Sequence, residues 1–389
     1  TLSSAGAAAG ATVVGGPYSI DITNAVGGEG LTNYLITYVA GTLTVDKANA
    51  TIVVTPYSAT YDGSAHTASG TATGVASEAL SGLDLSGTTH TGAGSYAADG
   101  WTFTDVTGNY NNTNGTVADG IGKANATVVV NGYTGVYDGV AHGASGSATG
   151  VSGEDLGSLL TLGASFTAVP GGAANWSFAG NANYNAASGT AGVVISKANA
   201  TVAVTPYSTT YDGAAHTATG TAKGVLNEDL SGLDLAGTTH TSAGSYGADG
   251  WTFTDSTGNY NNGSGTVSDS IAGAPLTVIV ADASRAYGQT NPVFGVSYSG
   301  FIDGQTNDVL GGGLSVSSAA DTNSAVGTYP ITASGLVGNN YALSYQDGTL
   351  AVTNALLTVT ANNTNKVYGQ AVTFSGGEFA VSGLVSTDS

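Results

Sequence analysis

Three near-copies of one phrase constrain the fold of this chain more than any other feature. The phrase is KANAT, an alternating segment and then Tyr-Asp-Gly, and its copies begin at Lys47, Lys123 and Lys197, about 75 residues apart. Self-similarity at a fixed period predicts a tandem array, in which each small module contacts mainly its neighbours in sequence. A module of this size buries only about 60% of its unfolded surface, so we expect neighbouring modules to stabilise one another.

The composition excludes several classes of function. The chain has no cysteine, which rules out disulfides and thiol chemistry. Six Lys or Arg stand against 26 Asp or Glu, and the net charge of −20 argues against nucleic acid and anionic membranes as partners. No apolar run approaches the roughly 20 residues of a membrane span, so we expect no membrane insertion within this segment. Because methionine is also absent, even at residue 1, we expect a processed product or a piece of a longer protein.

The modules are predicted to be mainly β. In the first copy, strand-like alternation occurs in TIVVTPYSATYDG, HTASGTATG, SYAADGWTFTD and GTVADGI. Trp101 and Phe103 alternate with threonines, which places both rings on one face of a strand. The helix candidates are ASEALSGL and its counterparts SGEDLGSLL and LNEDLSGL, so each module has at most one short helix.

Residues 274–354 repeat the landmarks of the KANAT modules in a different wording. Tyr287-Gly288 corresponds to Tyr61-Asp62, Gly327-Thr328-Tyr329 to Gly94-Ser95-Tyr96, and Asn340-Tyr341 to Asn109-Tyr110. Both wordings are therefore predicted to encode one fold.

The two end segments together contain one further module. Residues 355–389 begin like a module with ALLTVTANNTNKVYGQ, whereas residues 1–46 supply the closing half as strand, turn, strand, turn, strand. Either the chain continues in a longer polypeptide, or the C-terminal half of one molecule completes the N-terminal half of the next by strand addition. Both alternatives predict an extended fibre, and the third is an arbitrary boundary.

The motifs resemble those of two related families. The sequences Y-D-G, K-V-Y-G-Q and R-A-Y-G-Q, followed by GTYPITASGL and NNYALSYQDGTLAV, are similar to the YDG repeat and the YGX-type MBG module. These modules occur in tandem in very large bacterial surface proteins and filamentous-haemagglutinin-like adhesins. The resemblance divides the chain into the second half of a YGX-type module (1–46), three YDG-type modules (47–122, 123–196 and 197–273), a YGX-type module (274–354) and the first half of another (355–389).

The resemblance implies a fold and a location. It implies small immunoglobulin-like or β-grasp-like modules in an extended rod, secretion to the bacterial cell surface or an extracellular filament, and a stalk or adhesive role. It implies no catalytic residues, so we expect no enzyme. The second module departs from the pattern, because PGGAANWSFAG replaces GSYAADGWTFTD, and its corresponding edge is expected to differ in shape.

Histidines and acidic residues are the candidates for site chemistry. His66, His142 and His216 follow the Asp of Y-D-G by four residues, a spacing at which Asp and His can touch. No nucleophile accompanies them, so we interpret them as structural, with a His–Asp metal site as the alternative. Calcium is the ion that an acidic extracellular array favours, although no D-x-D-x-D-G loop is present. The calcium candidates, for which the alternative is capping of turns, are Glu154, Asp155, Glu228, Asp229 and Asp234.

Three further groups of residues have a structural interpretation beside a functional one. The lysines of KANAT are interpreted as exposed linker residues, with an isopeptide bond as the alternative. The aromatic residues Trp101, Trp176 and Trp251 are interpreted as core, with stacking on sugar rings as the alternative. Glycosylation is the functional reading, and chance the other, for the Asn-x-Thr/Ser asparagines at positions 49, 111, 114, 125, 175, 199, 262 and 362.

The sequence thus predicts a structural segment of an extracellular bacterial filament, stalk or giant adhesin. Its partners are copies of itself head to tail, or the rest of a longer chain. An adhesin whose modules bind carbohydrate, such as surface glycans, or bind another surface is the alternative function.

Overall fold

The structure is a computed structural model that describes residues 1–26, 30–385 and 388. These residues form strands and three-residue 3-10 turns, without an α-helix in the described ranges. The chain divides into two compact units, Thr1–Val136 with Val140–Ser196 and Tyr137–Gly139 with Lys197–Ser389. The mainly β prediction is confirmed.

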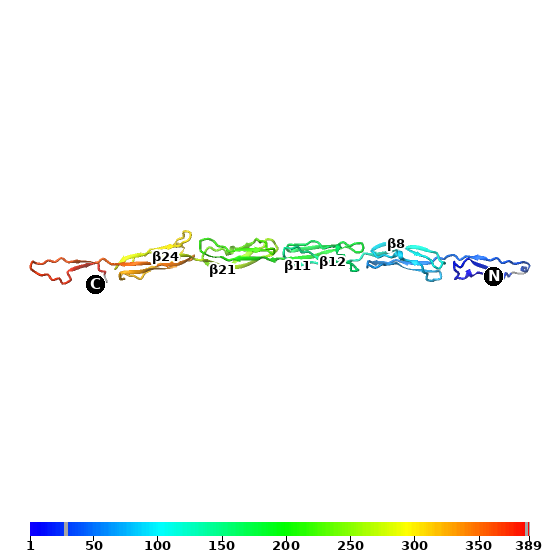
Figure 1. Cartoon of the computed structure of the whole chain (residues 1–389), viewed down its shortest axis with the longest axis horizontal. Coiled ribbons are helices and arrows are strands. Elements are labelled where there is room, and N and C mark those ends of the chain that lie inside the picture. The colour runs from blue at the N-terminus through cyan, green and yellow to red at the C-terminus, as the bar shows by residue number, and fades with distance from the viewer. Residues whose placement is uncertain (27–29, 386–387, 389) are drawn as a thin grey trace. The chain divides into compact units, whose positions relative to one another are not determined.

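The first unit contains the strands of residues 1–46 and of the first two KANAT modules (Figure 1). Its 3-10 turns are η1 (Ala5–Ala7), η2 (Leu31–Asn33), η3 (Ser86–Thr88) and η4 (Gly157–Leu159). Its strands are β1 (Leu2–Ser3), β2 (Tyr18–Ile22), β3 (Gly41–Leu43), β4 (Thr51–Thr55), β5 (Ser58–Thr60), β6 (Ser69–Thr73), β7 (Leu83–Asp84), β8 (Gly94–Phe103), β9 (Thr113–Gly122), β10 (Thr127–Asn131), β11 (Tyr133–Val136), β12 (Ser145–Thr149), β13 (Leu160–Thr161), β14 (Gly171–Phe178) and β15 (Ala187–Ser196).

The second unit contains the third KANAT module, residues 274–354 and the C-terminal segment. Its 3-10 turns are η5 (Ala236–Thr238) and η6 (Asn307–Val309). Its strands are β16 (Ala198–Asn199), β17 (Thr201–Thr205), β18 (Ser208–Thr210), β19 (Thr219–Lys223), β20 (Leu233–Asp234), β21 (Gly244–Phe253), β22 (Tyr260–Asn261), β23 (Gly263–Ala272), β24 (Ala274–Val280), β25 (Ala283–Ala286), β26 (Val296–Ser299), β27 (Gly311–Ser318), β28 (Gly327–Val337), β29 (Tyr341–Gln346), β30 (Gly348–Thr353), β31 (Thr358–Ala361) and β32 (Phe379–Ser382).

Each KANAT module has two main sheets, and the four strands from the Thr of KANAT onward alternate between them. In the first module β4 pairs with β6, and a four-stranded sheet has the order β5-β9-β8-β7 with β5 parallel to β9. The chain passes from the first sheet to the second at Pro56, which has no N–H to donate to a ladder. The segment TIVVTPYSATYDG is therefore two strands in two sheets.

The two sheets enclose one core. In the first module Ala72 of β6 and Phe103 of β8 lie in one buried cluster with Tyr110, and Trp101 packs against the same cluster. Phe103 is 1% exposed, and the third module repeats the arrangement with Phe253. Trp101 and Phe103 thus share a face, as predicted. Two sheets on one core, without a covering helix in the described residues, match the immunoglobulin-like rather than the β-grasp-like expectation.

The helix candidates are wrong. At ASEALSGL the chain turns between Gly74 and Glu78, and the residues that follow are extended. The reason is that the Glu78 side chain accepts the N–H of Ala76 at 3.0 Å, which fixes a tight turn in place of a helical one. A 3-10 turn, η3, comes only after β7.

The module of residues 274–354 is built around β24. This strand pairs antiparallel with β26 and parallel with β29, so it joins an early and a late segment of the module. A second sheet has the order β25-β30-β28-β27. Leu276 and Val278 of β24 are fully buried.

The end segments form smaller sheets than this module does. Residues 1–46 contain the sheet β1-β2-β3, and β31 pairs with β32. The middle strand predicted in residues 1–46, at NYLITYV, is not formed. Its counterpart β29 depends on parallel pairing with β24, and the counterpart of β24 is β31, in the other end segment. The turn predicted around 27–29 lies outside the described residues.

Candidate functional site

The Asn-Tyr pair near the end of each module builds a recurring site. In the second module the Tyr184 hydroxyl donates to the Glu154 carboxylate and accepts the N–H of Val151 at 2.8 Å. The tyrosine therefore holds the turn that follows β12 in its own module. Tyr110, Tyr260 and Tyr341 repeat this arrangement with Glu78, Glu228 and Gln305.

The acidic partner and the phenol adjust each other's ionisation. Burial and the hydrogen bond to Glu228 raise the pKa of Tyr260 to about 12. The bond from Tyr260 in turn lowers the pKa of Glu228 below its ordinary value of 4.5. A neutral phenol and an anionic carboxylate therefore coexist from mildly acidic to strongly alkaline pH.

The same tyrosine rings contact the tyrosine of the preceding Y-D-G. Within the first unit, the rings of Tyr61 and Tyr184 meet edge to face, with centroids 5.5 Å apart and planes at 84°. Within the second unit, Tyr211 meets Tyr341 at 5.7 Å and 75°. Tyr137 meets Tyr260 there in the same way, at 5.5 Å and 81°. Edge-to-face packing is a preferred geometry for aromatic pairs, and we call this contact the tyrosine junction.

A hydrogen bond accompanies the ring contact. Asn183, which precedes Tyr184, accepts the backbone N–H of Ala93 at 3.0 Å. Asn340 accepts the N–H of Ala243 at 2.9 Å in the second unit. The Asn-Tyr pair thus binds the preceding module through a side-chain amide and a ring at once.

Side-chain contacts within the Y-D-G turn hold the tyrosine of that turn in place. The Asp62 side chain accepts the N–H of Ser64 at 2.8 Å, and it lies 3.1 Å from the His66 ring. These two bonds lower the pKa of Asp62, the backbone bond having the larger effect. Asp212 and His216 repeat the contact at 2.9 Å, so the predicted Asp–His contact is confirmed in the first and third modules. In the second module the His142 ring lies 3.3 Å from the Tyr133 hydroxyl.

A second His–Asp pair lies nearby in the first and third modules. His90 lies 2.9 Å from Asp99 and stacks on Tyr96, with ring centroids 3.5 Å apart. In the second module Phe166 occupies the position of His90, and β14 pairs with β15 without the irregularity that interrupts β8. The edge of this module therefore differs in shape, as predicted.

The acidic calcium candidates bind protein groups. Glu154 and Glu228 cap turns and hold tyrosines, as described above. Asp155 and Asp234 accept the N–H two residues ahead, and Asp229 pairs with Lys223 at 2.7 Å. Among residues 1–26, 30–385 and 388, no three His, Cys, Asp or Glu side chains are grouped to hold a metal ion.

The KANAT lysines and asparagines lie on the surface. Lys123 donates to the carbonyl oxygen of Asn181 at 2.6 Å, a contact that offers no isopeptide partner. Asn49, of the first KANAT, accepts the side-chain amide of Asn111 at 2.9 Å, and Asn125 and Asn199 repeat this pair. These amides link the beginning of a module to its closing segment.

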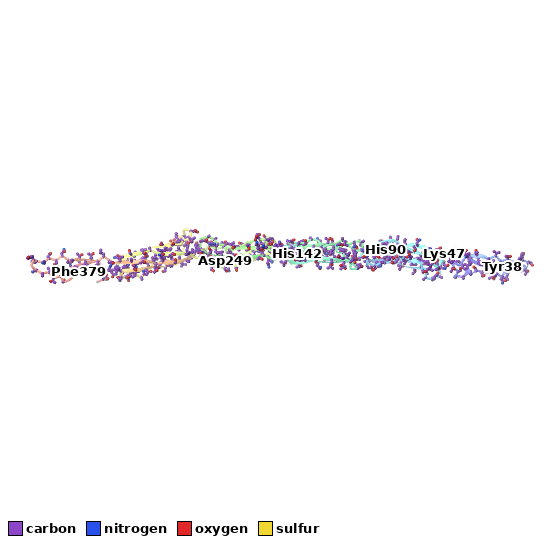
Figure 2. All side chains as sticks on the ribbon, in the orientation of Figure 1. Tyr38, Lys47, His90, His142, Asp249 and Phe379 are labelled. Atoms are coloured by element: carbon purple, nitrogen blue, oxygen red, sulfur yellow. The ribbon has the colours of Figure 1, made fainter. Side chains whose placement is uncertain are left out.

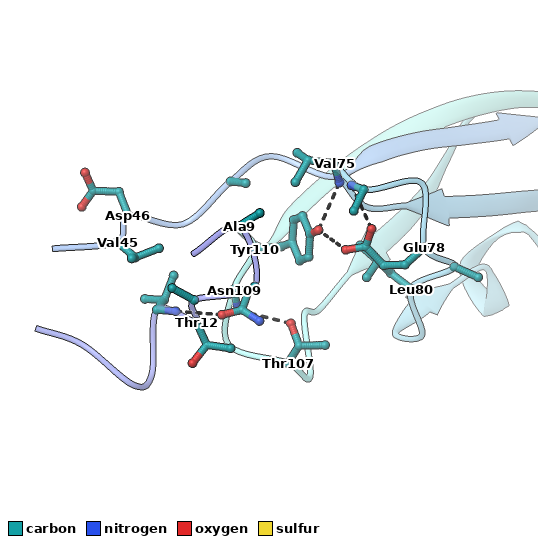
Figure 3. Close-up of a pocket in the computed structure, with 16 residues that line it drawn as sticks. Ala9, Thr12, Val45, Asp46, Val75, Glu78, Leu80, Thr107, Asn109 and Tyr110 are labelled. Carbon is teal, nitrogen blue, oxygen red and sulfur yellow. Dashed lines mark hydrogen bonds between the residues drawn. The ribbon is translucent and has the colours of Figure 1, made fainter. Parts of the chain in front are cut away.

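A cavity adjoins the first Asn-Tyr pair, in the first unit. It has a volume of about 450 Å³, and its lining includes Val75, Ala76, Glu78 and Tyr110 (Figure 3). Across it, Val13 donates its N–H to Asn109 at 2.8 Å, the same hydrogen bond that Ala93 makes to Asn183. Sequence reasoning treated Asn-Tyr only as a landmark, and its recurrence in every module was the signal for this site.

Comparison with known proteins identifies one module. Residues 276–351 match the model of the MBG domain (YGX type), so the module of residues 274–354 is of this type, as predicted. The YDG type of the three KANAT modules stays a prediction. None of the curated proteins compared with the chain matches it.

Two solved structures are similar over most of the chain. Immunoglobulin domains 1–5 of Sidekick-1 are 12% identical, covering 88% of this chain and 87% of that one, with a TM-score of 0.22. Domains 4–9 of surface layer protein SbsC are 10% identical, covering 83% and 72%, with a TM-score of 0.19. Both TM-scores lie too low to transfer the fold or function of those proteins. In the described part of the chain, no helix has the length and apolar character to cross a membrane.

Removing one junction ring should destabilise the module that it contacts. Tyr211 is 6% exposed, and we expect Tyr211→Ala to cost about 3–5 kcal/mol, because a large buried ring is lost. Tyr211→Phe keeps the ring and loses only the bond from Gln305, about 1 kcal/mol. Differential scanning calorimetry measures both, with Tyr345→Ala as the control at a 37% exposed tyrosine. Equal unfolding profiles for Tyr211→Ala and Tyr345→Ala would contradict the junction.

The carboxylate of the junction should contribute a stability that acid removes. Because the folded-state pKa of Glu228 lies below 4.5, its contribution is complete above that pH and is lost as the pH falls through the folded value. Glu228→Gln should therefore lose less of its melting temperature than the wild type does between pH 7 and pH 3. Circular dichroism melts at the two pH values test this, and an identical loss in both proteins would refute it.

Proposed function

We propose that this chain is a structural segment of an extracellular bacterial filament, stalk or giant adhesin, built as a rod of immunoglobulin-like modules. The observation that carries the proposal is the recurrence of one tyrosine junction at successive modules. A contact that recurs between modules adjacent in sequence is expected of a tandem array, in which each repeat contacts only its neighbours. The MBG module at residues 276–351 supports a location at the cell surface.

We further propose that the module divided between the end segments is completed by a second copy. In the intact module, β24 pairs in parallel with β29, with Ala274 opposite Tyr341. The corresponding residues are Ala355 in the C-terminal segment and Tyr34 in the N-terminal segment. Residues 34–39 of one copy would then extend the sheet of residues 355–360 of another, head to tail.

The exposure of the end segments supports this pairing. Tyr34 is 74% exposed, Leu357 48% and Val359 58%, in the end segments where Figure 2 labels Tyr38 and Phe379. Their counterparts in the intact module, Tyr341, Leu276 and Val278, are only 6%, 0% and 0% exposed. Apolar side chains on strands with unpaired edges favour pairing with another chain. The rest of a longer chain would present the same surfaces as a second copy does.

A second function is carbohydrate binding. A cavity of about 260 Å³ is lined by Trp251 together with Asn199, Asn261 and Asn262, and a ring beside amides is a suitable surface for a sugar. Most of the Trp251 environment belongs to the core of its module, so we place this function second. Glycan-array binding that Trp251→Ala abolishes would favour it. We expect no enzymatic activity.

Blocking the proposed strand should prevent association. Proline at Ile36 removes a backbone donor and clashes with strand pairing, so Ile36→Pro should abolish self-association of the full chain. Residues 34–39 form no strand in the single chain, so the substitution should leave its fold unchanged. Sedimentation velocity over a range of concentrations measures the effect, at about 0.15 M salt to screen the charge of −20.

The control is Val293→Pro, at a 100% exposed position outside the named strands. We expect the wild type and Val293→Pro to self-associate as the protein concentration rises, whereas Ile36→Pro stays monomeric. Association of Ile36→Pro equal to that of the wild type would overturn the pairing.

A further inference from the structure

We infer that Tyr368 and Gly369 of one copy dock into the cavity beside Tyr110 of a second copy. The inference rests on the proposed head-to-tail assembly and names a contact that the assembly would make beyond strand pairing. Tyr368 belongs to K-V-Y-G-Q and is therefore the counterpart of Tyr61, Tyr137, Tyr211 and Tyr287.

The counterparts of Tyr368 are engaged. The tyrosines of Y-D-G pack against the core of the module that follows: Tyr61 packs on the cluster of Tyr184, and Tyr211 lies in the cluster of Tyr341. The Tyr287 hydroxyl donates to Asp388 at 2.9 Å. By contrast Tyr368 is 101% exposed. The ring thus has the position in its module of a docking group, with its whole surface in solvent.

The glycines near these tyrosines also differ in whether the next module lies against them. A side chain at Gly139 would meet Leu226, and one at Gly288 would meet Val385, because the next module lies against each of these glycines. Gly369 has the same left-handed backbone, with φ at +87°, yet nothing lies within 4 Å of a Cβ placed there. Tyr368 and Gly369 therefore present a formed turn without an opposing module.

The cavity beside Tyr110 has the composition of the engaged receptors. Leu226, which opposes Gly139, corresponds to Ala76, and Val385, which opposes Gly288, corresponds to Val75. Both Val75 and Ala76 line the cavity together with Glu78 and Tyr110. Figure 3 shows the Tyr110 ring beside Glu78 and Val75, joined to both by hydrogen bonds.

The core behind this cavity is made by its own module. The cluster of Tyr184 includes Tyr61, and the cluster of Tyr260 includes Tyr137. The cluster of Tyr110 consists of residues between Ala48 and Tyr110, with no preceding tyrosine among the described residues. The N-terminal segment already makes the amide part of the junction, from Val13 to Asn109. The ring contact with Tyr110 is still missing from the described part of the chain, and the tyrosine that would make it, by its position in the module, is Tyr368.

We take a second copy as the occupant, because the chain itself carries both the exposed ring and the receptor cavity. The receptor lies in the first unit and Tyr368 in the second, so the contact between copies is head to tail and can repeat from copy to copy. The ring would meet Tyr110 edge to face, and its hydroxyl would donate to Glu78 as that of Tyr287 does to Asp388. Desolvated tyrosines at the centre of an interface carry much of its binding energy.

A photo-crosslinking amino acid at position 368 tests the contact in the full chain. Tyr368→p-benzoylphenylalanine keeps a ring there, and irradiation should yield dimers and larger species. Mass spectrometry should find the link in residues 75–80 or 107–110 of a different, isotope-labelled copy. Links confined to one chain, or links elsewhere, would overturn the inference.

Association constants supply the second readout. Tyr368→Ala should weaken self-association by at least about tenfold, Tyr368→Phe by less, and Val293→Ala not at all. Ala76→Trp, at an exposed residue, should weaken it from the other side by filling the cavity. All of these positions lie on the surface, so each variant should fold, and circular dichroism checks that it does.

The outcomes separate this inference from the proposed function. If Tyr368→Ala associates like the wild type while Ile36→Pro does not, the docked tyrosine is wrong and the strand pairing stands. If neither substitution changes association, both are wrong. If Tyr368→Ala, Ala76→Trp and Ile36→Pro each weaken it, both stand.

Discussion

The structure of each module depends on the tyrosine of its Asn-Tyr pair, which makes contacts through both its hydroxyl and its ring. The hydroxyl binds a carboxylate and a backbone N–H of its own module, and the ring receives the tyrosine of the module before. One side chain thus stabilises a turn and a boundary together. A module with so small a core gains from such a contact, and a chain without cysteine has no disulfide to replace it.

The parallel pairing of an early with a late strand is the second constraint. In residues 274–354, β24 pairs with β29, and β25 pairs with β30, so neither half of the module completes its sheets alone. The end segments obey the same rule, because residues 34–39 form no strand where β29 is one. The rule explains why Tyr34, Leu357 and Val359 are exposed, whereas their counterparts Tyr341, Leu276 and Val278 are buried.

Periodicity predicted the elements that depend on neighbours in sequence. The alternation of Trp101 and Phe103 predicted a shared face, and the spacing of Asp62 and His66 predicted their contact. Local propensity failed at ASEALSGL, because Glu78 binds Tyr110 and the N–H of Ala76 instead of supporting a helix. The junction could not be predicted either: Ala93 and Asn183 lie 90 residues apart, in a chain with 20 tyrosines and abundant asparagine.

The claim that a second copy completes the divided module can be measured at single amides. Hydrogen–deuterium exchange of residues 34–39 and 355–360, followed by mass spectrometry over a range of protein concentrations, reports their pairing directly. Because β31 already pairs with β32, the account predicts rapid exchange of residues 34–39 in dilute solution and slow exchange at high concentration, with added protection of residues 355–360 at the same midpoint. Rapid exchange at every concentration in solutions where the chain self-associates would contradict it.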